Sequence, residues 1–136
     1  MMNTTNQAMK QPRPTLEQQR AQDAWKCSEN CSEDYMKLAK GLPAMIMNSG
    51  LMQVMAFLHE KGQKPSQKHC EVLGNDLRTW LHGRFGKLIN GADFKFFMQS
   101  LMTATPSDYQ AINAEALAWL KWLRQMSAAV AKGGGE

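Results

Sequence analysis

The chain has 136 residues, of which 43% are hydrophobic, so it is long enough for one packed core, and a wholly disordered protein is excluded. Its net charge of +4 is mildly basic and falls short of a histone-like excess. Three cysteines do not indicate a disulfide framework, and the polar N-terminus is not a secretory signal, so we expect a cytoplasmic protein.

The first predicted element is a helix that follows a polar tail. Residues 1–14 are polar and proline-containing, which predicts a disordered tail ahead of a helical domain over residues 15–132. Thr15 and Gln18 have the spacing of a capping box, so the helix is expected to begin at Thr15. Small and apolar residues then recur every three or four positions as far as Leu42, which predicts one continuous helix of about six turns.

The second predicted helix contains the longest apolar region of the sequence, residues 42–58. Pro43 is suited to the first turn of a helix, so the helix is expected to begin there, with Gly50 as a kink or a point of close approach. Apolar residues surround this helix nearly all the way round, which predicts a central position in the bundle. Pro43, Gly50 and several polar residues make the region too short and too interrupted for a membrane span.

The third predicted helix begins at Ser66 and ends near Gly83, with Val72 among its buried residues. Residues 83–91 are glycine-rich and basic and predict a loop. This loop lacks the spacing and the hydroxyl of a phosphate-binding loop.

Two more helices are predicted to begin at Asp93 and at Thr105, where Thr105 and Pro106 supply a cap and a first-turn proline. The glycine run predicts a flexible tail over residues 133–136. No segment alternates with a period of two. The sequence therefore predicts an all-α, single-domain bundle of about five helices.

The positive charge is concentrated in one part of the sequence. Between Lys61 and Lys95 seven basic residues stand against three acidic ones, and this difference of +4 equals the net charge of the whole chain. Such a region can attract phosphate groups. The alternative is a solvated surface with a small excess of lysine.

Metal binding and catalysis have little support. Cys27 and Cys31 share one side of a helix, and His69 and Cys70 could add two zinc ligands. However, Cys31 lies in the apolar stripe and an adjacent His-Cys pair is poor ligand spacing, so inert buried thiols are the better interpretation. The histidines lack a nucleophile at a motif spacing, and the carboxylates are scattered. We therefore expect no cofactor, no metal and no enzymatic activity.

Two tryptophans of the last helix differ in position. Trp119 lies within the apolar stripe and is expected in the core. Trp122 lies off its centre, beside Lys121 and Arg124, and an exposed tryptophan beside cations is typical of a partner surface. For Trp122 the core and the partner contact remain equal alternatives.

Three stretches of the sequence resemble a known family. They are residues 19–25, residues 42–58 with the segment Asn48-Ser49-Gly50-Leu51, and residues 116–123. In order and spacing they resemble the small α-helical subunit of type III-B CRISPR effector complexes, the Cmr RAMP module, over roughly residues 15–130. The central stretch is the most specific of the three.

This resemblance implies a helical bundle that stacks head to tail into a short filament beside the backbone subunits that hold the guide RNA. The expected partners are the other subunits of the complex, copies of the chain itself, and the guide RNA and target RNA, with no membrane. Contacts to RNA are expected to be independent of sequence, and cleavage is expected to belong to other subunits.

The expected RNA-contacting residues come from the resemblance (Arg20, Asn48, Gln53) and from the charge distribution (Lys61, Lys64, Lys68, Arg84, Lys87). The expected partner contacts are Trp122, Lys121 and Arg124. An alternative hypothesis is a helical adaptor that joins proteins and never touches RNA, which the methionine-rich apolar residues 45–58 favour. A helical enzyme ranks third.

Overall fold

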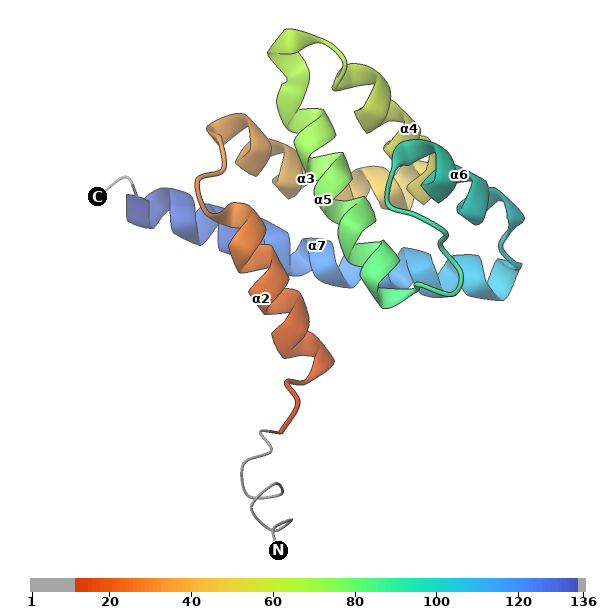
Figure 1. Cartoon of the computed structure of the whole chain (residues 1–136). Helices are drawn as coiled ribbons and strands as arrows, with labels where there is room; N and C mark the ends of the chain where they lie inside the picture. The colour runs from red at the N-terminus through yellow and green to blue at the C-terminus, as the bar shows by residue number, and fades with distance from the viewer. Residues whose placement is uncertain (1–11, 135–136) are drawn as a thin grey trace, which may run out of the picture.

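The computed structural model describes residues 12–134, and within that range the chain is a single helical domain without strands (Figure 1). Its elements are the α-helices α2 (Leu16–Ser28), α3 (Glu33–Ser49), α4 (Leu51–Lys61), α5 (Lys68–Arg84), α6 (Phe94–Thr103) and α7 (Pro106–Gly134), with a 3-10 turn, η1 (Pro65–Gln67), ahead of α5. The all-α prediction is confirmed, with six α-helices in this range where about five were expected. Most of the predicted N-terminal tail (residues 1–11) and the last two residues lie outside the described range.

The helix predicted to run from Thr15 to Leu42 is two helices. Its start is as predicted, because Thr15 Oγ1 accepts a hydrogen bond from the Gln18 amide at 3.0 Å and Gln18 Oε1 accepts one from the Thr15 amide at 2.7 Å. The chain then leaves the helix at Asn30, whose φ of 61° lies in the left-handed region, and Ser32 caps the start of α3. The prediction of one helix is wrong because the apolar spacing continues in phase across this break.

The next predicted boundary is also wrong. Pro43 lies in the interior of α3 and does not begin a helix. Gly50, with a φ of 86°, separates α3 from α4 and is the C-cap of one helix and the N-cap of the other. Its amide donates to the carbonyl of Ile46 at 2.7 Å, and its carbonyl accepts from Val54 at 3.2 Å. A side chain would be strained at this φ, which is why glycine marks the junction.

The longest helix, α7, has 29 residues and packs against α2, which crosses it, and against α3, while α4 and α5 pack against each other and α6 lies against both (Figure 1). The core between them contains Trp119, Phe97, Met55 and Leu77, all fully buried. The predicted central position holds only in part, because α4 buries one side and leaves Phe57 38% exposed on the other. Val72, expected inside, is exposed on α5.

The predicted starts at Asp93 and Thr105 are confirmed, whereas Ser66 lies in η1 and α5 begins two residues later, at Lys68. Asp93 is the N-cap of α6, and the Thr105 hydroxyl accepts from the Asp108 amide at 3.1 Å at the start of α7. The predicted basic loop is held to the domain by the fully buried Ile89, whose carbonyl lies 2.9 Å from His82 Nδ1.

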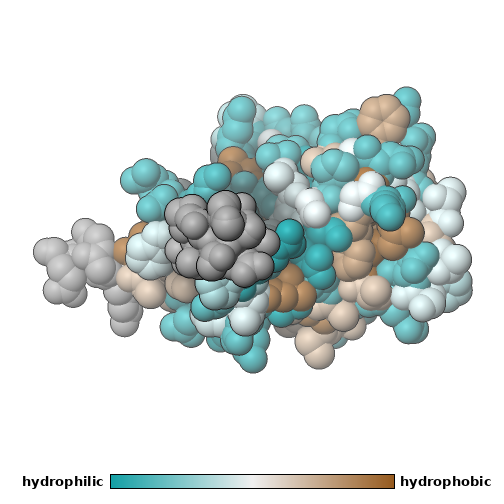
Figure 2. Space-filling model, turned by 60° about the horizontal axis from the view of Figure 1, so that its bottom comes forward, coloured by the Kyte–Doolittle hydropathy of each residue, from teal (hydrophilic) through white to brown (hydrophobic). Residues whose placement is uncertain are grey.

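The surface of the domain is mixed in polarity. On the face shown in Figure 2, apolar side chains form separate patches among polar ones. None of the described helices is both long enough and apolar enough to cross a membrane.

Candidate nucleic-acid interface

One predicted RNA contact, Arg20, lies in an internal ion pair. Its Nε and Nη2 each donate to a different oxygen of Glu115 at 2.8 Å. Trp80 Nε1 donates to the same carboxylate at 3.0 Å, and Arg84 Nε lies 3.8 Å from it. The four side chains join α2, α5 and α7, so this cluster holds three helices together.

The electrostatics of the cluster keep it charged. Glu115 is only 5% exposed, and burial alone would raise its pKa. The hydrogen bonds from Arg20 and Trp80, with the charges of Arg20 and Arg84, outweigh burial and lower the pKa of Glu115. The hydrogen bond to Glu115 likewise raises the pKa of Arg20. The charge of Arg20 is therefore largely balanced inside the domain.

The basic region of the sequence is not one surface. Arg78, which contributes to the charge count, is 2% exposed and donates to Glu71 at 3.0 Å. The exposed Lys87 follows the C-terminal end of α5, beside Arg84, whereas Lys68 begins α5. A helix of 17 residues spans roughly 25 Å, so the exposed lysines at the two ends of α5 form separate groups, while Lys95 lies on α6.

The larger exposed group surrounds the connection between α4 and α5. Lys61 ends α4, Lys64 precedes η1, and Lys68 begins α5. Lys64 and Lys68 are exposed and Lys61 is half-buried. The three lysines predicted from charge are thus brought together by one short turn, and among the described residues none of them forms a salt bridge.

A shallow groove lies beside this group, on α3 and α4. It has a volume of about 190 Å³ and is lined by Met45, Ser49, Gln53, Val54 and Phe57. The Lys61 Nζ atom lies 5.8 Å from the centre of the Phe57 ring. The predicted Asn48 and Gln53 are both exposed, at the end of α3 and on α4. Sequence analysis missed Phe57, although its spacing of four from both Gln53 and Lys61 places all three on one helix face.

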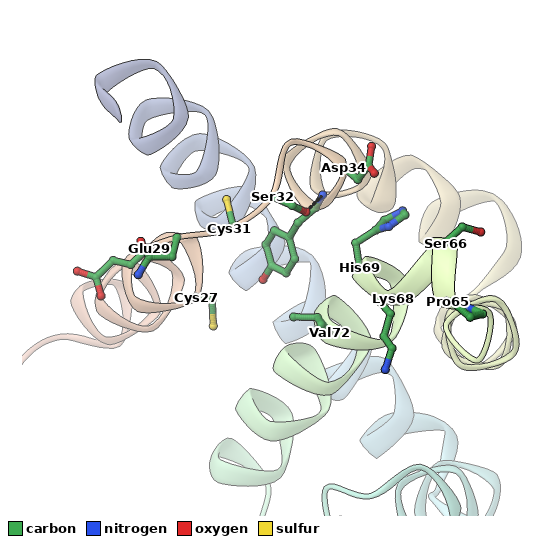
Figure 3. Close-up of a pocket in the computed structure, with 12 residues that line it drawn as sticks. Cys27, Glu29, Cys31, Ser32, Asp34, Pro65, Ser66, Lys68, His69 and Val72 are labelled. Atoms are coloured by element: carbon green, nitrogen blue, oxygen red, sulfur yellow. Dashed lines mark hydrogen bonds between the residues drawn. The ribbon is translucent and has the colours of Figure 1, made fainter. Parts of the chain in front are cut away.

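A separate cleft of about 460 Å³ opens between the α2–α3 turn and the start of α5 (Figure 3). Cys27, Cys31, Lys68 and His69 are among its lining residues. Burial raises the pKa of the Cys27 and Cys31 thiols, which keeps them protonated and poorly nucleophilic at neutral pH. Within residues 12–134, no three His, Cys, Asp or Glu side chains are grouped so that they could hold a metal ion.

Two more hydrogen bonds, both partly buried, tie the helices together near this cleft. Trp119 Nε1 donates to Asp23 at 2.8 Å, joining α7 to α2, and Trp119 is in the core as predicted. The Tyr35 hydroxyl donates to Asp76 at 2.8 Å, joining α3 to α5. Burial raises the pKa of Asp76 despite this hydrogen bond.

The predicted partner contacts are on α7. Trp122 is partly buried against the core, while Lys121 and Arg124 are exposed. Trp122 is therefore partly a core residue, and its remaining surface lies beside two cations, where the partner contact was predicted.

The sequence and the fold of this chain both match one protein family. Residues 16–130 match the model of the family described as CRISPR-associated protein (Cas_Cmr5). The fold is similar to the X-ray crystal structure of a CRISPR-associated Cmr5 family protein from Thermus thermophilus, with a TM-score of 0.69 and 25% sequence identity over 87% of this chain and 98% of that chain. Both matches cover most of the helical domain.

Proposed function

Because the chain belongs to the Cas_Cmr5 family of CRISPR-associated proteins, we propose that it is a structural subunit of a type III-B effector complex that contacts RNA without reading its sequence. Its partners in this proposal are the other subunits, copies of itself, and the guide and target RNA. Catalysis is assigned to other subunits.

The observation that supports RNA contact most is the cluster of Lys61, Lys64 and Lys68 around the α4–α5 connection. Lysine ammonium groups neutralise phosphates as point charges and do not distinguish bases. This property suits a subunit that must accept many guides. Copies stacked along a filament would repeat the cluster and add their fields along one groove.

The test is charge reversal of these three lysines in the assembled complex. The variant K61E/K64E/K68E should bind target RNA more weakly, and the slope of log affinity against log salt should fall by about 2 if three phosphate contacts are lost. A matched variant, K26E/K37E/K40E, changes the charge of exposed lysines on α2 and α3 by the same amount and should keep the slope. Equal salt dependence in both variants would refute this assignment.

The adaptor without RNA contact is the second candidate, because large apolar side chains are exposed. Met47 is 75% exposed on α3, and Phe57 lies on the neighbouring α4. Apolar surface of this kind is typical of protein contacts. Ultraviolet crosslinking of the assembled complex separates the candidates, since an adaptor would give no adduct between this chain and RNA.

A further inference from the structure

We propose that the exposed face of α4 is a stacking platform for an unpaired RNA base, with Phe57 against the base and Lys61 and Lys64 on neighbouring phosphates. The inference rests on the proposed function. It adds that the contact is base stacking, that the bound RNA is unpaired, and that Phe57, which carries no charge, takes part.

The first argument is the alignment of side chains. Gln53, Phe57 and Lys61 are four residues apart, so they form one line along α4, on the side opposite the buried Met55. Phe57 is 38% exposed in the middle of this line, between an amide and a cation. An aromatic ring between polar groups offers its face to a base at a small cost in desolvation.

The second argument is the position of Lys61. Its Nζ lies 5.8 Å from the centre of the Phe57 ring, in the range of a cation–π contact. Such a contact is weak at an exposed site, so a base can replace the ammonium on the ring. The released ammonium is then within reach of the backbone phosphate next to that base.

The third argument is the groove beside the ring. Met45 and Val54 give it apolar sides, while Ser49 and Gln53 supply a hydroxyl and an amide. Both polar groups can donate and accept hydrogen bonds, so they can meet the edge of any base. Such a site favours stacking without strict base specificity, as single-strand binding requires.

Charge favours RNA over a protein as the occupant. From the start of α4 to the start of α5 (residues 51–68) there are three lysines and one acid, Glu60, a net +2. The cations lie at one end of the groove, where a chain of phosphates leaving the stacked base would pass. A duplex keeps its bases stacked inside, so the platform selects unpaired nucleotides.

The test compares three side chains at position 57 in the full chain. Fluorescence anisotropy measures binding of a labelled single-stranded oligouridylate and of an RNA duplex of equal length. Phe57→Leu should weaken single-strand binding at least roughly fivefold, because the apolar volume remains but stacking is lost. Phe57→Trp should keep the affinity, and its indole fluorescence should be quenched by the RNA. Duplex binding should not change in either variant.

The matched control is Phe96→Leu, since Phe96 is an exposed aromatic (49%) on α6. It should bind the single strand as the parent does. Circular dichroism melting of all variants checks that the fold is kept.

The outcomes separate this inference from the proposed function. Parent-like affinity of Phe57→Leu, together with weaker binding by K61E/K64E/K68E, would overturn the platform and leave RNA contact standing. Retained RNA binding with leucine but loss with tryptophan would overturn it too, because binding would then depend on the size of the side chain at position 57 and not on stacking. If neither the chain nor the assembled complex binds either RNA, both proposals fail.

Discussion

Glu115 is the residue whose replacement should disturb the fold most specifically. Its carboxylate accepts three hydrogen bonds, two from Arg20 and one from Trp80, and it is almost fully buried. In Glu115→Gln one acceptor oxygen becomes an NH2 group, which faces a donor. The guanidinium of Arg20 then lacks a balancing charge, although its 21% exposure lets water compensate in part.

The expected loss is roughly 2–4 kcal/mol of unfolding free energy, around the lower part of the range for breaking a buried ion pair. For a domain of this size the loss corresponds to a fall of about 10 °C in the melting temperature. Urea denaturation followed by circular dichroism measures it. Arg84→Gln is the matched control and should cost less than about 1 kcal/mol, because Arg84 lies 3.8 Å from the carboxylate and its side chain is 33% exposed.

The pH dependence follows from the direction of the pKa shift. Folding lowers the pKa of Glu115 below its ordinary value of 4.5, so its stabilisation is present above that value and is lost as the pH falls through the folded pKa. The difference between the parent and Glu115→Gln should therefore be full at neutral pH and shrink in acid. A loss under about 1 kcal/mol at neutral pH, or an equal loss in Arg84→Gln, would refute the reasoning.

Two further predictions concern packing and a buried acid. Gly62→Ala should destabilise the fold by roughly 1–3 kcal/mol, because a Cβ there would lie 2.6 Å from the Glu71 amide nitrogen. The control is Gly41→Ala, where a Cβ would have nothing within 4 Å. In the same urea titration it should stabilise the fold by up to about 1 kcal/mol. Asp76→Asn should be more stable than the parent at neutral pH, by at most about 1 kcal/mol, because burial raises the pKa of Asp76 and the amide oxygen can still accept from Tyr35. That gain should vanish in acid, where Asp76 is protonated, and a gain independent of pH would contradict the argument.

Local signals predicted several helix starts, but the cap at Ser32, which begins α3, was missed. Thr15 and Thr105 were identified as caps because side chain and spacing act within a single turn, and Asp93 was identified as a helix start. The break at Asn30 was missed because the apolar period continues across it. Pro43 was misplaced because its position in a helix depends on packing around α3, which no local rule includes.

The candidate site was predictable in part, for a related reason. The three lysines near η1 are close in sequence, so a charge count finds them. Arg20 pairs with Glu115, which is 95 residues away in the sequence. Arg78 pairs with Glu71 on the same helix, but the sequence alone does not show that Arg78 is buried and needs this partner. A count of charges therefore includes arginines that the fold uses internally.

Under the proposed function, this division between arginine and lysine would separate stability from RNA binding. Arg20 and Arg78 donate to Glu115 and Glu71, pairings that suit the planar guanidinium group. Lysines supply the exposed positive charge near the α4 face. If the two sets are independent, Glu115→Gln should lower the melting temperature without changing the salt slope of RNA binding. K61E/K64E/K68E should lower that slope without lowering the melting temperature. A changed salt slope in Glu115→Gln, measured where that variant is still folded, would show that the internal ion pair also positions the lysines that we propose to contact RNA.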